Sequence, residues 1–178
     1  LIFDEIQSGM GRTGKLFGHE HEGITPDIMT LAKALGGGFP IGAMLSSEEV
    51  SGGFSPGMHA STFGGNALAC AVGYAATTTI ADPAFLERVN VAGARLRTAL
   101  EVLRSRFSFI GEVRGRGLWL GVDVSIDGAK IVDRAFHKGL LLNHIGGRVL
   151  RFAPALNISD AELDEAVRVL GECCGELS

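Results

Sequence analysis

The chain has 178 residues, of which 46% are hydrophobic and 20% are charged. This composition provides enough apolar side chains for a hydrophobic core and excludes a largely disordered protein. Its 16 basic and 20 acidic residues give a formal net charge of −4, which argues against a nucleic-acid-binding protein, because such proteins usually carry a basic surface. No apolar run approaches the roughly 18 residues needed to cross a bilayer, so we expect no membrane partner.

Cysteine and glycine usage narrow the expectations further. Three cysteines, of which Cys173 and Cys174 are adjacent, form neither a disulfide framework nor a zinc site with usable spacing, and this favours a reducing, cytoplasmic setting. The 26 glycines cluster, for example at 9–14 and 36–42, which is typical of turns where the backbone approaches another group closely. Because Leu1 already lies in an apolar run, we expect the chain to be part of a longer protein.

The first half of the chain carries the pattern of an α/β unit. Short apolar runs at 1–3, 27–31 and 41–45 predict strands, the first of them buried on both faces of a parallel sheet. Residues 5–26 mix glycine with polar residues and predict a long loop. The uncharged segment 65–80, which is rich in Ala and Thr, predicts a buried helix.

The second half has a different pattern. Apolar residues at helical spacing predict an amphipathic helix over 83–106. The sequence after this helix predicts a small α+β unit. Ser159, followed three residues later by Glu162, is a capping box that opens the last helix. The remaining predicted elements are strands at 109–114, 118–124, 140–143 and 148–152 and a helix at 128–138.

Two short motifs suggest ligands but lack the necessary context. Residues 9–14 match the G-x-G-x-x-G dinucleotide pattern and, with Lys15, most of a P-loop. Leu16 stands where a P-loop requires Ser or Thr for magnesium, and no good helix pattern follows the glycines, as a dinucleotide site requires. The run HEHE at 19–22 invites a metal interpretation, but its spacing does not fit a helical His pair and no third ligand is evident. We expect a solvated loop there and no bound metal.

Asp4 and Lys33 form the more informative pair. Asp4 ends the first predicted strand and Lys33 follows the second, and ligands of open parallel sheets bind at the carboxyl ends of the strands. A lysine with little solvent and a cationic neighbour has a lowered pKa and attacks carbonyl groups, while a buried acid needs a cationic partner. Pyridoxal phosphate meets both needs, with an aldehyde for the lysine and a ring nitrogen for the acid. A structural Asp–Lys ion pair explains the same spacing equally well.

Two longer stretches carry a resemblance to a known family. FDEIQSGMGRTGKLFGHEHEGITPDIMTLAKALGGGFPIGAM and HASTFGGNALACA closely resemble the class III, or subgroup II, pyridoxal-phosphate-dependent aminotransferases, and VRGRGLWLG and VLRFAPALNIS extend the resemblance toward the C-terminus. The resemblance implies a fold type I enzyme of the α/β class. Residues 1–80 would be the C-terminal portion of its large, mainly parallel cofactor-binding domain, 81–106 a connecting helix and 107–178 a small C-terminal α+β domain.

The resemblance also implies roles for individual residues at the cofactor. Asp4 matches the aspartate that pairs with the pyridinium nitrogen, and Gln7 matches the group that hydrogen-bonds the 3-oxygen of the ring. Lys33 matches the Schiff-base lysine. These three residues are the expected core of the site.

Three further matches concern the neighbouring subunit and the substrate. Thr62 matches the threonine that reaches the cofactor phosphate in the partner subunit, and Ser61 is expected beside the substrate there. Arg151 matches the arginine near the substrate carboxylates, which a planar guanidinium binds in bidentate fashion. The resemblance therefore implies a homodimer with shared active sites.

The expected activity follows from the same resemblance. It implies transamination between an amino acid and a 2-oxo acid, with most similarity to members that use N-acetylornithine and 2-oxoglutarate in arginine biosynthesis. Members that act on ornithine, 4-aminobutyrate or succinyl-diaminopimelate remain alternatives. A further alternative is that the 178-residue chain alone is a non-catalytic fragment without stable cofactor.

Overall fold

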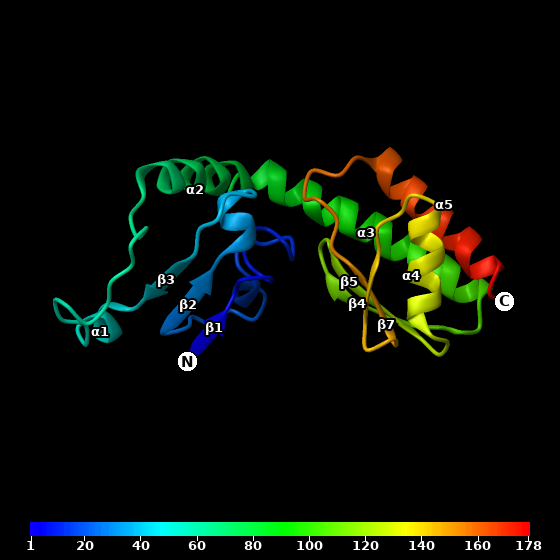
Figure 1. Ribbon diagram of the computed structural model, residues 1–178, viewed down its shortest axis with the longest axis horizontal. Coiled ribbons are helices and arrows are strands. Elements are labelled where there is room, and N and C mark those ends of the chain that lie inside the picture. Colours follow the sequence, from blue (N-terminus) through cyan, green and yellow to red (C-terminus); the bar gives the residue numbers. More distant parts are fainter. The chain divides into compact units, whose positions relative to one another are not determined.

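The computed structural model describes residues 1–178, and its chain divides into two compact units, Leu1–Glu87 and Arg88–Ser178 (Figure 1). The division falls inside helix α3 (Pro83–Arg106), whose first turn belongs to the first unit and whose remainder belongs to the second. The three-part division at 1–80, 81–106 and 107–178 stays a prediction. Not one of the helices combines the length and apolar character needed to cross a membrane.

The first unit is built on a three-stranded sheet with the order β1-β2-β3, formed by β1 (Ile2–Asp4), β2 (Ile28–Leu31) and β3 (Ala43–Ser46). β1 runs parallel to β2, while β3 is antiparallel to β2. All three predicted strands are therefore present. Among these 178 residues β1 is an edge strand and Ile2 is 66% exposed, so the first strand is not buried on both faces within this chain.

Helices follow the sheet in the first unit. α1 (Glu48–Ser51) is a single turn, and α2 (Ala67–Ile80) begins where the Asn66 side chain accepts a hydrogen bond from the Ala69 amide at 3.0 Å. The helix predicted over 65–80 is therefore confirmed. Its predicted burial is wrong for most positions, since residues such as Tyr74 (74% exposed) face outward.

The second unit contains a four-stranded antiparallel sheet with the order β4-β5-β7-β6. Its strands are β4 (Ile110–Arg116), β5 (Trp119–Val124), β6 (Asn143–Ile145) and β7 (Val149–Phe152). The strand predicted at 140–143 is misplaced, because the strand observed in this region, β6, begins at Asn143. Gly139 takes a left-handed conformation (φ 83°) and the Leu140 amide donates to the Ala135 carbonyl at 2.8 Å, so Leu140 still belongs to the end of the preceding helix.

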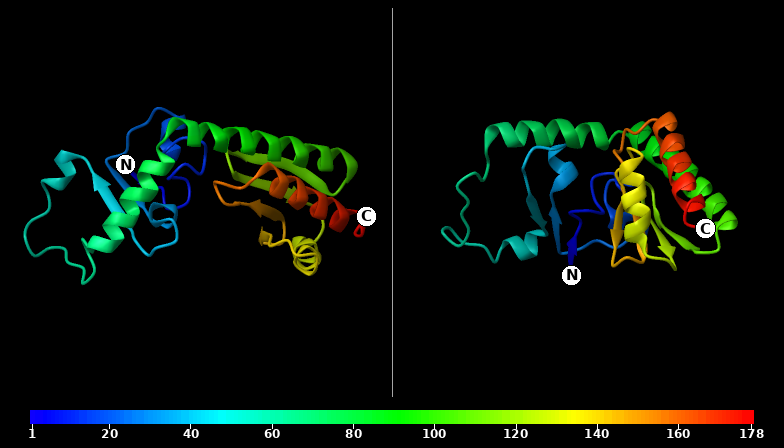
Figure 2. Two further views of the ribbon diagram at one scale, coloured as in Figure 1. Left: turned by 90° about the horizontal axis from the view of Figure 1, so that it is seen from above. Right: turned by 45° about the vertical axis from the view of Figure 1, so that its right-hand side comes forward.

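Three helices accompany this sheet (Figures 1 and 2). α3 is as predicted, α4 covers Gly128–His137, and α5 covers Asp160–Gly175 with the predicted capping box formed by Ser159 and Glu162. Gly93 in α3 lies against Gly117, whose carbonyl oxygen would be 2.3 Å from a Cβ added at Gly93. The buried core is formed by side chains from all these elements, including Val89, Leu96, Leu100, Val113, Leu120, Val122, Ile131, Leu150, Leu163 and Leu170.

Candidate active site

The parallel pair β1 and β2 brings the two central predicted residues to one edge of the sheet. Asp4, the last residue of β1, stands opposite Thr30 in β2. Its Oδ1 accepts hydrogen bonds from the Ile6 amide at 3.0 Å and from Thr30 Oγ1 at 3.2 Å. Lys33 follows Thr30 by three residues, just past the end of β2. Asp4 and Lys33 therefore both lie at the carboxyl ends of these two strands, where α/β sheets bind ligands.

The exposure of these two residues differs from the expectation. Asp4 and Lys33 are both exposed, so the predicted buried acid and the predicted lysine with little solvent are wrong for this structure. The reason is that β1 is an edge strand and Lys33 lies beyond Leu31, the last residue of β2 that pairs with β3.

The structural ion pair that the sequence left open is not formed. The side chain of Lys33 makes no hydrogen bond or ion pair, and both hydrogen bonds to the Asp4 carboxylate go to Oδ1. The ammonium of Lys33 and Oδ2 of Asp4 are therefore both available to a ligand.

The backbone at Lys33 is unusual. Lys33 has φ 50°, in the left-handed region, directly after the extended residue Ala32. A 3-10 turn, Lys33–Gly36, begins there. A left-handed conformation at a residue other than glycine costs of order 1 kcal/mol and is enriched at functional positions. The sequence alone gave no signal for this feature.

A buried carboxylate lies directly after Asp4. Glu5 is 3% exposed. Its two oxygens accept hydrogen bonds from Ser8 Oγ at 2.6 Å, the Gly18 amide at 2.9 Å and the His19 amide at 2.8 Å, and Oε1 lies 3.2 Å from His19 Nδ1. Sequence analysis missed Glu5, although a carboxylate next to a predicted site residue could have drawn attention to it.

Glu5 is held in its ionised form. Burial alone raises the pKa of Glu5, but the hydrogen bonds from Ser8, from the amides of Gly18 and His19 and from the His19 ring outweigh this effect, and the pKa lies below its ordinary value of 4.5. An ionised carboxylate can only accept hydrogen bonds, so His19 donates to it from Nδ1.

The HEHE run is not the solvated loop that we expected. Its first three residues lie in the 3-10 turn Gly18–His21, in which the His19 side chain is only 14% exposed and stacks on Phe17 with ring centroids 5.6 Å apart, while Glu22 is exposed. His21 Nε2 lies 3.0 Å from Thr13 Oγ1. Both histidines thus connect this turn to earlier parts of the chain.

Ser61 and Thr62 belong to neither of these two strands. Both are exposed, in the segment that joins α1 to α2 and that leads away from the sheet (Figure 1). The same segment exposes apolar side chains, including Phe54 (47%), Met58 (65%) and Phe63 (80%).

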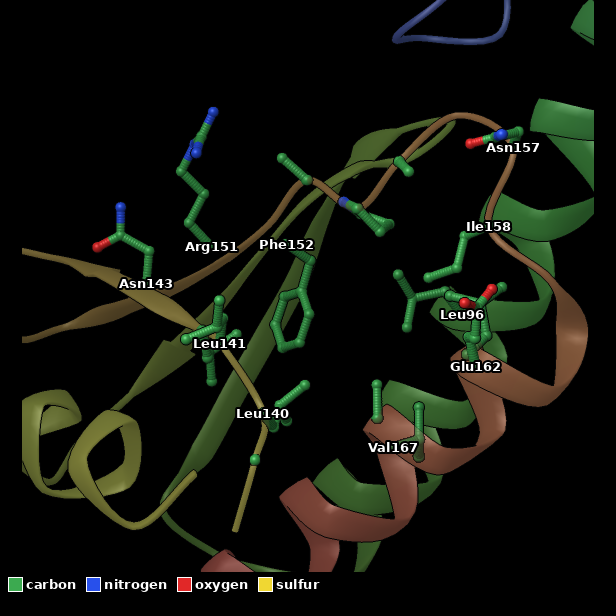
Figure 3. Close-up of a pocket in the computed structure, with 17 residues that line it drawn as sticks. Leu96, Leu140, Leu141, Asn143, Arg151, Phe152, Asn157, Ile158, Glu162 and Val167 are labelled. Carbon is green, nitrogen blue, oxygen red and sulfur yellow. The ribbon is translucent and has the colours of Figure 1, made fainter. Parts of the chain in front are cut away.

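Arg151 belongs to the second unit, on β7. It pairs in register with Gly121 on β5 and with Asn143 on β6. It lines a pocket of about 820 Å³, whose apolar wall includes Leu140 and Phe152. The side chains of Arg151 and Asn143 lie next to each other and extend away from this wall (Figure 3). Asn143 was not predicted, since nothing in its sequence context distinguishes it.

The chain was compared with known proteins. Residues 1–174 match the family model described as aminotransferase class-III. An acetylornithine aminotransferase of Caldanaerobacter subterraneus is 50% identical over 178 residues, which cover 99% of this chain and 45% of the relative. The chain thus spans less than half the length of the curated relatives it matches.

Solved structures of aminotransferases are also similar to this chain. N-acetylornithine aminotransferase from Stenotrophomonas maltophilia is 42% identical with a TM-score of 0.88, covering 99% of this chain and 47% of that one. An ornithine aminotransferase of Toxoplasma gondii, described with partial occupancy of pyridoxal phosphate at its active site, is 39% identical with a TM-score of 0.92, covering 99% and 42%. The expected fold class is therefore confirmed, and pyridoxal phosphate is the cofactor that this relationship indicates. The chain belongs to the class-III aminotransferase family.

Proposed function

We propose that the protein containing this chain is a pyridoxal-phosphate-dependent transaminase that exchanges an amino group between N-acetylornithine and 2-oxoglutarate. The observation that carries the proposal is the arrangement of Asp4 and Lys33. A carboxylate and an amine stand at neighbouring strand ends, and no ion pair between them satisfies either group.

The residues at this edge fit pyridoxal phosphate. The free Oδ2 of Asp4 can pair with the ring nitrogen, and the exposed amine of Lys33 can hold the aldehyde carbon covalently. Gln7 is exposed in the turn after Asp4, and we propose that its amide would hydrogen-bond the ring oxygen. When bound, the cofactor supplies an electron sink for negative charge at the substrate carbon.

The chain's own residues supply the proton chemistry. Asp4 keeps a proton on the ring nitrogen, because an anionic oxygen stabilises the protonated form. Nζ of Lys33 would remove the proton from the substrate carbon as a general base and would then deliver it, as a general acid, to the cofactor carbon. Thr30 holds Oδ1 of Asp4 and so fixes the carboxylate.

Arg151 is proposed to bind a substrate carboxylate. Its guanidinium offers a planar pair of donors, and the Asn143 amide beside it in Figure 3 offers a further donor. N-acetylornithine is preferred as substrate because of the similarity to acetylornithine aminotransferases. Ornithine is the main alternative, because structures of ornithine aminotransferases are equally similar in fold.

We further propose a homodimer in which Thr62 and Ser61 serve the active site of the partner subunit. Both residues are exposed, which supports this assignment. The apolar side chains exposed in the same segment, Phe54, Met58 and Phe63, are also those that a subunit interface would cover. For the location we propose the cytoplasm, because the three cysteines form no disulfide framework.

The test of the reaction is a substrate panel with the full-length enzyme. Purified protein loaded with pyridoxal phosphate is mixed with N-acetylornithine, ornithine, 4-aminobutyrate or succinyl-diaminopimelate, each with 2-oxoglutarate, and glutamate formation is measured. We expect the highest kcat/KM with N-acetylornithine. A higher kcat/KM with ornithine would identify ornithine, rather than N-acetylornithine, as the substrate. If none of the four amino donors led to glutamate, the proposed function would be contradicted.

A further inference from the structure

We propose that Glu5 and His19 form a positioning pair that fixes Asp4 and Gln7 in their orientation toward the cofactor. The inference rests on the proposed function and extends it to two residues that do not touch the cofactor themselves. Glu5 and His19 meet across 14 residues of sequence, with both the amide and the ring of His19 bound to the same carboxylate oxygen.

Exposure at the end of β1 and in the turn after it distinguishes the residues that would face the cofactor from the residue that would position them. Asp4 and Gln7 are exposed, whereas Glu5 between them is buried. The backbone of Glu5 is fixed at both ends, because its amide donates to the Thr30 carbonyl at 3.0 Å and its carbonyl accepts from the Gly9 amide at 2.9 Å. Gln7 therefore lies in a turn whose start is bonded to β2 and whose end returns to Glu5.

The side chain of Glu5 connects this turn to a distant part of the loop. One oxygen binds Ser8 inside the turn, and the carboxylate also binds the amides of Gly18 and His19. The ring of His19 then contacts Phe3 in β1, with ring centroids 6.2 Å apart. The Glu5–His19 pair thus connects three segments: the turn after β1 that contains Gln7, the 3-10 turn Gly18–His21, and strand β1 itself.

The atoms packed around Glu5 leave this residue little freedom to move. A Cβ at Gly18 would lie 3.0 Å from Oε2 of Glu5, and a Cβ at Gly9 would lie 2.8 Å from the Glu5 carbonyl oxygen. If Glu5 moves, the backbone of the turn must move with it. The Ile6 amide, which follows Glu5 directly, is one of the two donors that hold Oδ1 of Asp4. Displacing Glu5 therefore displaces a donor of Asp4 as well.

The main variant is His19→Phe in the full-length enzyme. Phenylalanine keeps a ring to stack on Phe17 but removes the Nδ1 donor to Glu5. Apoenzyme is titrated with pyridoxal phosphate, and the visible absorbance band of the lysine-bound cofactor is followed. We expect the half-saturating cofactor concentration to rise about tenfold and kcat to fall about tenfold, since a hydrogen bond to a charged group has about this worth. KM for the amino donor should stay within about twofold of the parent.

Two further variants control for stability. His19→Asn places an amide N–H near the position of Nδ1 and is expected to restore most of the cofactor affinity. His21→Phe changes the other half-buried histidine of the same turn, which binds Thr13 rather than Glu5. It is expected to retain the cofactor affinity, the absorbance band and kcat of the parent, even if its thermal midpoint falls.

A second, independent variant is Glu5→Gln, which keeps the shape and removes the charge. The same weakening of cofactor binding is expected. Parent-like cofactor affinity and kcat in His19→Phe or in Glu5→Gln, with only a lower thermal midpoint, would overturn the inference. So would an equal loss of affinity in His21→Phe. If the unsubstituted enzyme itself bound no pyridoxal phosphate, the proposed function would fail instead.

Discussion

Asp4 and Thr30 face each other across the parallel strands β1 and β2, and the Thr30 hydroxyl donates a 3.2 Å hydrogen bond to Oδ1 of Asp4. This contact leaves Oδ2 of the carboxylate free at the carboxyl end of the sheet. Lys33 follows the neighbouring strand β2 at the same edge, and its side chain has no hydrogen-bond or ion-pair partner. The arrangement explains how one short pair of strands can present both groups that the cofactor needs.

Asp4→Asn should bind the cofactor but lower kcat by orders of magnitude. An amide has no negative charge to keep the ring nitrogen protonated, so the carbon that loses its proton is no longer stabilised. Steady-state kinetics on the full-length enzyme measure the effect. Thr30→Val is the milder comparison and should lower kcat by about tenfold, the worth of a hydrogen bond to a charged group. Near-normal turnover of Asp4→Asn would make Asp4 a structural residue.

Gly93→Ala should destabilise the protein strongly. The added Cβ would lie 2.3 Å from the carbonyl oxygen of Gly117, and backbone atoms cannot move aside as a flexible side chain can. We expect a loss of about 1–3 kcal/mol or more, as for other overpacked sites. Gly175→Ala is the matched control, since nothing lies within 4 Å of its Cβ position at the end of α5. Thermal unfolding of both variants decides whether the close contact exists.

The ionised Glu5 should make part of the stability depend on pH. Because the pKa of Glu5 is lower in the folded protein than its ordinary 4.5, the carboxylate stabilises the fold above the ordinary pKa. This contribution is lost as the pH falls through the lower, folded-state pKa. Glu5→Gln should therefore lower the thermal midpoint at neutral pH and differ less from the parent in acid. A constant difference across that range would show that the charge of Glu5 contributes nothing.

Subunit exchange tests the shared active site. An inactive Lys33→Ala enzyme is mixed with an inactive Thr62→Asp enzyme, whose added charge repels the cofactor phosphate. In a mixed dimer, one site receives an intact lysine and an intact threonine, and the other receives neither. Activity should return, up to one working site per mixed dimer. Confirmed exchange without any activity would assign Thr62 to the site of its own subunit.

Local patterns predicted much of the fold. The amphipathic helix 83–106 and the capping box at Ser159 agree with the structure, because helical spacing and N-terminal caps are local properties of the sequence. Burial was predicted less well, as β1 and α2 show, because exposure depends on which other segments cover an element. The strand predicted at 140–143 begins only at Asn143, because the pattern could not reveal that Leu140 completes the end of α4.

The candidate site likewise contains features that the sequence predicted and features that it did not. The order of strands and the position of Asp4 and Lys33 after them predicted the shared edge. The buried Glu5, its contact with His19 and the left-handed backbone at Lys33 depend on how residues 5–21 fold back on themselves. Such contacts between distant residues leave no periodic signal in the sequence.

The most direct test of the central claim is to identify the lysine that holds the cofactor. Full-length enzyme loaded with pyridoxal phosphate is reduced with borohydride, digested and analysed by mass spectrometry. We expect the reduced cofactor to be attached to Nζ of Lys33, and we expect Lys33→Ala to have neither the label nor transaminase activity. Attachment to Lys15, or a label that persists in Lys33→Ala, would contradict it.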